Sequence, residues 1–169
     1  MKTLVLDPGL RAAGVSLWQD GVLQTATVIR LRSRVRDGEG WVPMARKIVK
    51  WAGPVDLLVY ERMVYLPEWA SAKGGHGVVD DLLQLTGLTG VVIGLLNPPR
   101  IVAYTPLQWK NRGETKHQTA HDMPLRLSVE ERGAYRDGVR DVPEGLKHNA
   151  IDAVAIGSFH HQRKKIYNP

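Results

Sequence analysis

The apolar and polar positions of the N-terminal part of the chain predict three strands. Residues 3–7 form a short apolar run that ends at the turn signal Asp7-Pro8-Gly9, and an extended pattern resumes from Gly14 to Trp18. The dipeptide Asp20-Gly21 is typical of a hairpin turn, and residues 22–31 alternate again. We therefore expect the chain to open with three antiparallel strands in a meander.

The rest of the chain alternates between helical and strand-like spacing of apolar residues. Helices are predicted over residues 41–51, 78–96 and 148–161, and buried strands over 55–60 and 100–104. Residues 132–145 contain glycines and are expected to be irregular. The order predicts a mixed five-stranded α/β sheet flanked by helices. No repeat or linker divides the chain, so we expect one domain over residues 1–169.

Gly87, Gly90 and Gly94 recur at spacings of three and four inside the predicted helix 78–96. Such spacing gives a helix one smooth face, which lets another backbone approach closely. This pattern favours either packing against the sheet or a contact between two copies of the chain.

Composition narrows the class of partner. The chain has 23 Lys and Arg against 17 Asp and Glu, a formal net charge of +6, which favours an anionic partner such as nucleic acid. The absence of cysteine excludes a disulfide scaffold, a thiolate zinc site and a nucleophilic thiol. Uninterrupted apolar runs are much shorter than the ~20 residues that span a bilayer, and the first strand leaves no room for a signal peptide. We therefore expect a cytoplasmic protein without a membrane partner.

Three acidic residues stand where the predicted fold can bring them together. Asp7 ends the first strand, Glu61 follows the buried strand, and Asp152 lies among small apolar residues of the last helix. An isolated carboxylate in such a setting is costly, so these residues need a partner or a metal ion. Clustered carboxylates select hard cations such as Mg²⁺ or Mn²⁺. Two such ions can activate water and stabilise the leaving oxygen in phosphodiester hydrolysis.

Four segments in chain order resemble RuvC-type Holliday junction resolvases, which belong to the retroviral-integrase/RNase H superfamily. They are Leu6-Asp7-Pro8-Gly9 with Gly14-Val15-Ser16, Val59-Tyr60-Glu61, Trp109-Lys110 with Gly113-Glu114-Thr115-Lys116, and His148 to Ile156. The resemblance spans essentially the whole chain. It implies an RNase H-like fold and a metal-dependent endonuclease that resolves four-way DNA junctions by two symmetric cuts, with two Mg²⁺ or Mn²⁺ ions per site.

The resemblance also implies residue roles. The metal ligands would be Asp7, Glu61, Asp152 and the residue at position 149, and Lys116 would sit near the scissile phosphate. Two symmetric cuts in a junction of approximate two-fold symmetry need two sites related by a dyad, so a homodimer through the helix 78–96 is expected. Resolvases of this kind occur in bacteria and bacteriophages, so the cytoplasm would be that of a bacterial cell or an infected host.

Position 149 departs from the family pattern, because Asn149 stands where resolvases usually have a carboxylate or, in some members, a histidine. Residues three apart share a helix face, so Asn149 and Asp152 could bind the same metal ions. One hypothesis is that Asn149 replaces an Asp and disables catalysis while keeping the shape of the site. The alternative is that Asn149 is native and His148 serves as a substitute ligand.

Basic and aromatic residues beside these segments are candidates for DNA contact. A run of alternating arginines and an aromatic, glycine-rich loop after Glu61 suit a DNA backbone and unpaired bases, although a solvated strand edge and a packed loop cover are the plain alternatives. The predicted DNA-binding residues are Arg30, Arg32, Arg34, Arg36, Tyr65, Trp69, Lys73, Lys110, Arg112, Lys116 and His117. The remaining histidines, among them His160 and His161, are expected on the surface or at the DNA.

Three other functions are compatible with parts of the pattern. A nuclease of the same fold that acts on flaps, forks or RNA would share the metal site, and a module that binds junctions without cutting them would share the basic surface. An ATP-binding domain of the actin and sugar-kinase type opens with a similar strand, turn and strand, but such proteins contain a second similar half that 169 residues cannot hold.

Overall fold

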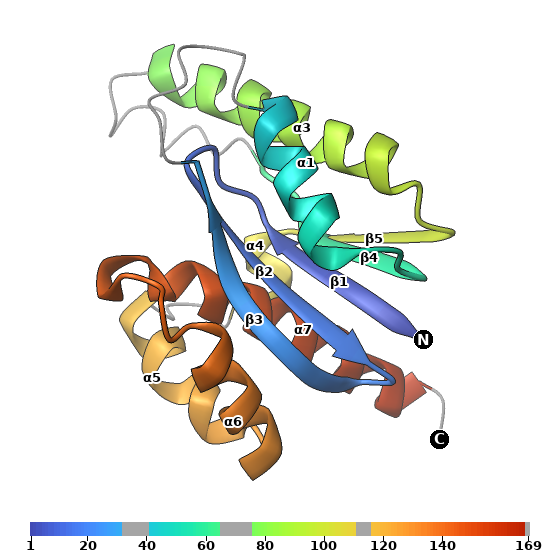
Figure 1. Cartoon of the computed structure of the whole chain (residues 1–169), viewed down its shortest axis with the longest axis vertical. Coiled ribbons are helices and arrows are strands. Elements are labelled where there is room, and N and C mark those ends of the chain that lie inside the picture. The colour runs from blue at the N-terminus through green and yellow to red at the C-terminus, as the bar shows by residue number, and fades with distance from the viewer. Residues whose placement is uncertain (32–40, 65–75, 111–115, 168–169) are drawn as a thin grey trace.

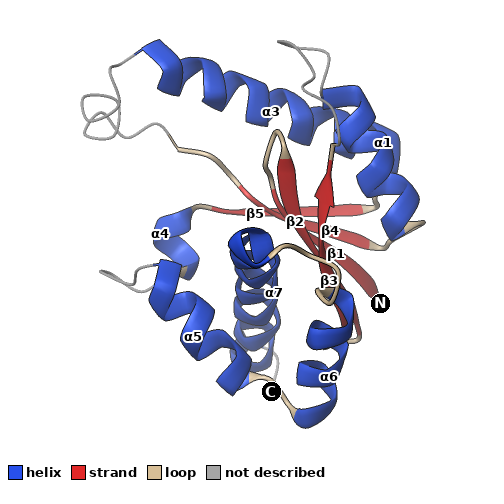
Figure 2. Ribbon diagram, turned by 60° about the vertical axis from the view of Figure 1, so that its left-hand side comes forward, coloured by secondary structure: helices blue, strands red, loops and turns tan. Residues whose placement is uncertain are grey.

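The computed structural model describes residues 1–31, 41–64, 76–110 and 116–167, and for residues 76–78, 116–117 and 163–167 it describes the backbone only. A single twisted sheet runs through the middle of the molecule (Figure 1). Helices α1 and α3 cover one face of the sheet, and α4, α5, α6 and α7 lie on the other (Figure 2).

The sheet has five strands in the order β3-β2-β1-β4-β5. The strands are β1 (Lys2–Asp7), β2 (Ala12–Gln19), β3 (Val22–Arg30), β4 (Leu57–Glu61) and β5 (Arg100–Tyr104). The first three pair antiparallel, whereas β4 runs parallel to both β1 and β5. The predicted mixed five-stranded sheet with an antiparallel meander is confirmed.

Alternation along the strands divides the core into two layers. Leu4 and Leu6 of β1 pack with α1 (Trp41–Ala52) and α3 (His76–Leu96), whereas Val5 packs with α7 (Lys147–Tyr167). Successive side chains of a strand point to opposite faces, so each strand contributes to both layers. The predicted helices 41–51, 78–96 and 148–161 correspond to α1, α3 and α7.

The region expected to be irregular contains a helix. After α4 (Pro106–Trp109) and α5 (Lys116–Arg126), residues Val129–Gly138 form α6, and a 3-10 turn follows at Glu144–Leu146. Ser128 and Glu131 cap α6 reciprocally, since each side chain accepts a hydrogen bond from the backbone N–H of the other. Tyr135 is buried against the α7-side core. The prediction was wrong for residues 132–138, because the cap and this buried contact outweigh the helix-weakening glycines.

Helix α3 is long and apolar, but few of its described residues are buried. One of its faces packs on α1 through Leu88 and Val92, and Gly87 makes room for Trp41, whose ring lies 2.5 Å from where a Cβ would be. Residues Val79–Leu96 have a mean hydropathy of 1.5, and 17% of them are buried. By length and composition alone, this helix could cross a membrane. Expectations based on uninterrupted runs missed this property.

The backbone of helix α7 lies directly against the backbone of strand β2. A Cβ on Gly14 of β2 would lie 1.8 Å from the carbonyl oxygen of Asn149, so only glycine fits there. One turn further along, the buried Ser16 hydroxyl donates to the Ala153 carbonyl at 3.1 Å and accepts from the Trp18 indole at 2.9 Å. These contacts fix the height and rotation of α7 on the sheet.

Replacing Gly14 by alanine is expected to destabilise the fold by about 1–3 kcal/mol, because the added methyl group overpacks a main-chain contact. The free energy of unfolding from denaturant titration measures this effect. Gly133→Ala is the matched control: nothing lies within 4 Å of where its methyl group would stand in α6, and alanine there should stabilise the helix by about 0.5–1 kcal/mol. Equal effects of the two substitutions would contradict the close contact at Gly14.

Candidate active site

Two of the predicted acids end neighbouring strands on the same side of the sheet. Asp7 is the last residue of β1 and Glu61 the last of β4, and these parallel strands pair with Leu6 opposite Tyr60. Val5 and Val59, two residues earlier in each strand, belong to the α7-side core. Strand alternation therefore directs Asp7 and Glu61 to the face that α7 covers.

Helix α7 carries the other two predicted ligands on that face. Asp152 is 5% exposed. Asn149 lies three residues earlier, and its carbonyl oxygen abuts Gly14, which pairs directly with Asp7. The Asn149 side-chain Nδ2 donates to the Ala12 carbonyl at 3.3 Å, which leaves its oxygen as the atom able to bind a cation. The first turns of α7 thus lie against the strand that neighbours Asp7.

Helix α4 adds two residues that connect these acids. The Trp109 indole N–H donates to Glu61 Oε2 at 2.8 Å. The ammonium of Lys110 lies 3.9 Å from Asp152 Oδ2 and 4.5 Å from the centroid of the Trp109 ring. Glu61 on β4 and Asp152 on α7 are therefore linked through two consecutive residues of a third element.

The position of Trp109 follows from how α4 begins. Strand β5 ends at Tyr104, opposite Glu61, so the next residues start beside the end of β4. Thr105 and Gln108 form a capping box, and Pro106 occupies the first helical turn, where its missing N–H is no loss. This tight turn from strand to helix brings Trp109 back to Glu61.

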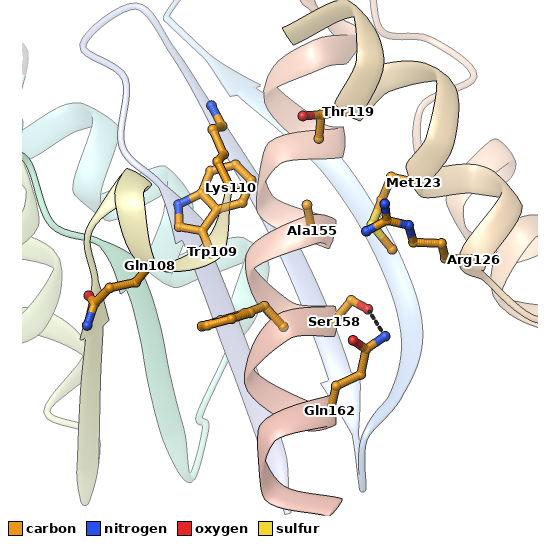
Figure 3. A pocket seen from close by; sticks show the side chains of 10 residues that line it. Gln108, Trp109, Lys110, Thr119, Met123, Arg126, Ala155, Ser158 and Gln162 are labelled. Carbon is orange, nitrogen blue, oxygen red and sulfur yellow. Dashed lines mark hydrogen bonds between the residues drawn. The ribbon is translucent and has the colours of Figure 1, made fainter. Parts of the chain in front are cut away.

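A polar groove continues from Trp109 and Lys110 along α7 (Figure 3). Its volume is about 170 Å³, and α5 contributes Met123 and Arg126 to the opposite wall while Ser158 lies on α7 between them. Lys110 and Arg126 give the groove cationic borders. Such a border suits the phosphates of a nucleic-acid strand.

The donor chemistry at this edge fits a hard divalent cation, because three carboxylates and one amide oxygen lie on one face. Among the described residues, however, no group of three His, Asp or Glu side chains is close enough to hold a metal ion. The role of these three acids as ligands of a shared metal ion therefore stays a prediction. Glu61 is turned to the Trp109 indole and Asp152 faces Lys110, so the protein's own donors engage these carboxylates.

The described part of the chain contains few of the predicted DNA-binding side chains. Arg30 is exposed at the end of β3, and its carbonyl accepts from Lys47 Nζ at 2.8 Å. Lys110 faces Asp152 as described above. The predicted residues that lie outside the described part are Arg32, Arg34, Arg36, Tyr65, Trp69, Lys73 and Arg112, together with the side chains of Lys116 and His117.

Two histidines expected at the surface are buried instead. His160 is 4% and His161 8% exposed. Nδ1 of His160 lies 3.0 Å from the Tyr104 hydroxyl, and the ring of His161 lies 5.1 Å from that of Trp18. The expectation failed because α7 is buried on most of its circumference in this part, so polar ring atoms are accommodated inside. His148 is half-buried in the first turn of α7, and its role as a substitute ligand stays a prediction.

The sequence argument missed the contacts of Trp109 and Lys110 with the acids. The signals available were the Thr105-Pro106 helix start and the need of a buried indole N–H for a partner. Neither identifies Glu61 as that partner, because the pairing depends on the exact turn between β5 and α4.

No family model and no curated protein matches the sequence. Solved structures do match it. Thermus thermophilus RuvC in complex with a Holliday junction substrate has 15% identity and a TM-score of 0.58, covering 98% of this chain and 96% of that one. The yeast mitochondrial Holliday junction resolvase Ydc2 has 13% identity and a TM-score of 0.60, covering 98% and 80%.

The fowlpox virus Holliday junction resolvase is a more distant neighbour, with 9% identity and a TM-score of 0.50 over 98% of this chain and 99% of that one. At these identities the likeness establishes a shared fold. Over nearly its whole length, the chain thus has the RNase H-like fold of RuvC-type resolvases.

Proposed function

We propose that this protein is a metal-dependent endonuclease that resolves four-way DNA junctions by paired, symmetric phosphodiester hydrolysis. The observation that carries the proposal is the placement of Asp7 and Glu61 at the ends of adjacent parallel strands, on the face where α7 presents Asp152 and Asn149. The fold adds support, because solved structures that share it are Holliday junction resolvases. The formal net charge of +6 suits a DNA substrate.

The ligands of the proposed site are Asp7, Glu61, Asp152 and the side-chain oxygen of Asn149. Bound Mg²⁺ or Mn²⁺, two ions per site, would supply an activated water and stabilise the leaving oxygen. Trp109 and Lys110 contact two of these carboxylates. For Asp152 to bind a metal ion, the Lys110 ammonium has to move away from it. The ammonium is then available to the phosphate.

The cationic residues near the site have two proposed tasks. Lys110 and Lys116 offset negative charge that develops on the phosphate and the leaving oxygen. Arg30, together with the predicted basic residues of 32–36 and 110–117, binds the sugar-phosphate backbone. Tyr65 and Trp69 are proposed to stack on unpaired bases at the centre of the junction.

Asn149 bears on whether the present sequence is active. Its amide donates to the Ala12 carbonyl, a bond that a carboxylate cannot form. An amide also supplies an oxygen ligand without the negative charge that a divalent ion favours. We propose that aspartate at position 149 gives the more active enzyme, with a native Asn149 assisted by His148 as the alternative.

The exposed face of α3 is the proposed dimer interface. Leu83 is 64%, Leu95 48% and Val79 46% exposed, and a Cβ added at Gly90 or Gly94 would meet nothing within 4 Å. A second copy of the same helix would cover these apolar side chains, and the glycines would allow the two backbones to approach. A dyad there supplies the two active sites that a symmetric junction needs.

Cleavage of a labelled mobile four-way junction in Mg²⁺ or Mn²⁺ tests the activity. We expect Asn149→Asp to make paired symmetric nicks at least about ten times faster than the parent chain, because it restores a charged ligand. Adding Asp7→Asn to Asn149→Asp should abolish cleavage while junction binding in Ca²⁺ is retained.

Two outcomes would redirect this proposal. A parent chain as active as Asn149→Asp would contradict the disabling role of Asn149. Equal cleavage of flap, fork or RNA–DNA hybrid substrates would favour another nuclease of this fold, and junction binding without cleavage by every variant would favour a binding module.

Lys110→Met should respond to Mg²⁺ more strongly than the parent chain. Without Mg²⁺ the variant is expected to be less stable than the parent chain, because the buried Asp152 loses a cationic neighbour. Bound Mg²⁺ stabilises the folded state by mass action, and in the variant the Lys110 ammonium no longer competes for Asp152. The rise of Tm with Mg²⁺ should therefore be larger. Lys50→Met, on the exposed face of α1, is the control, and an equal rise in both variants would contradict the competition.

Leu83→Glu is expected to turn a dimer into a monomer in sedimentation velocity at micromolar concentration, because a charge would be buried in the α3 contact. Leu125→Glu, on the exposed side of α5, should remain dimeric. A monomeric parent chain, with and without junction DNA, would rule out this interface. Flotation of the parent chain with phosphatidylcholine vesicles would indicate that lipid covers α3 instead.

A further inference from the structure

We propose that Trp109 is a positioning residue that holds Glu61 and Lys110 in a fixed mutual arrangement and thereby sets the affinity of the site for divalent cations. This inference rests on the proposed function, because it assumes that Glu61 is a metal ligand. Its physical basis is that one rigid ring contacts both residues, by its edge and by its face.

The edge of the ring fixes the Glu61 carboxylate. The indole N–H donates to Oε2 at 2.8 Å, while Trp109 is 9% exposed and packs in the α7-side core. A free glutamate side chain samples many rotamers, and its terminal torsion is broad. A bond from an immobile donor removes much of that freedom and so fixes the direction in which the carboxylate faces.

The face of the same ring receives Lys110. Its ammonium lies 4.5 Å from the ring centroid, within the range of a cation–π contact, and 3.9 Å from Asp152 Oδ2. In Figure 3 the side chain of Lys110 runs alongside the Trp109 ring. Trp109 therefore determines where the ammonium stands relative to Asp152 as well as where Glu61 points.

The short helix α4 makes this coupling rigid. Residues 109 and 110 are consecutive, the Lys110 N–H bonds to the Pro106 carbonyl at 2.9 Å, and the Thr105–Gln108 capping box fixes the start of the turn. A shift of α4 would move both contacts together. One turn of a third element thus contacts both Glu61 on β4 and Asp152 on α7.

The neutrality of the donor matters. An arginine or lysine at position 109 would also bind Glu61, but its charge would compete with an incoming cation for that carboxylate. An indole N–H orients the carboxylate without neutralising it, which is the usual role of a group that supports a metal ligand. Tryptophan thus combines a neutral donor with a face that attracts Lys110.

The test uses Trp109→Phe, which keeps an aromatic ring in the core but removes the N–H. We expect its affinity for Mg²⁺, measured by calorimetry without DNA, to fall about tenfold. Trp51→Phe is the matched control, because Trp51 packs on the opposite face of the sheet. An unchanged Mg²⁺ affinity in a folded Trp109→Phe protein would overturn the proposal.

Indole resonances of the ¹⁵N-labelled parent chain give a readout that does not require the phenylalanine variant to be stable. The chain has five tryptophans, and the Trp109 signal is the one shifted by Glu61→Gln. We expect Mg²⁺ to move this signal and leave that of Trp51 in place. If Glu61→Gln shifts no indole signal, or shifts one that Mg²⁺ leaves in place, the proposal is overturned.

The two proposals fail in distinguishable ways. Mg²⁺-dependent movement of the Trp109 signal, in a protein whose Asn149→Asp variant cleaves no branched DNA, would retain the positioning role and reject the nuclease. Junction cleavage by Asn149→Asp that Trp109→Phe leaves unchanged, with unchanged Mg²⁺ affinity, would retain the nuclease and reject the positioning role.

Discussion

The architecture of the site depends on the contact between α7 and strand β2. At Gly14 the two backbones meet with no space for a side chain, and Ser16 ties the next turn to the sheet by a buried hydrogen bond. Since Gly14 pairs with Asp7, this contact sets the separation between the acid of β1 and the polar residues of α7. If a side chain at position 14 separated α7 from β2, Asn149 and Asp152 would lie further from the strand ends.

The second constraint is the negative charge of the acidic residues at the site. Neighbouring groups of the protein itself partly offset this charge. Carboxylates gathered at one end of a sheet repel one another and lose hydration when buried. Trp109 donates to Glu61 and Lys110 stands beside Asp152, so two of the acids have a donor or a cation from the protein itself beside them.

The sequence predicted most of the fold because its signals are local. Strand alternation and the Asp20-Gly21 turn determine the meander, and the small apolar neighbours of Asp152 correctly indicated its burial. Helix α6 was missed because Gly133 and Gly138 read as breakers, whereas a capping box and tertiary packing outweighed them. The partner of Trp109 was not predictable, because it depends on the geometry of a turn between elements far from Glu61 in sequence.

Helix α6 has a consequence for how copies of this protein meet. Strand β3 lies at the edge of the sheet, where unpaired backbone groups invite strands from other molecules. Glu131, besides capping α6, accepts the backbone N–H of Leu23 at 3.0 Å, and α6 packs along β3. The helix thus shields this edge from cross-molecule sheet extension, which is a route to aggregation.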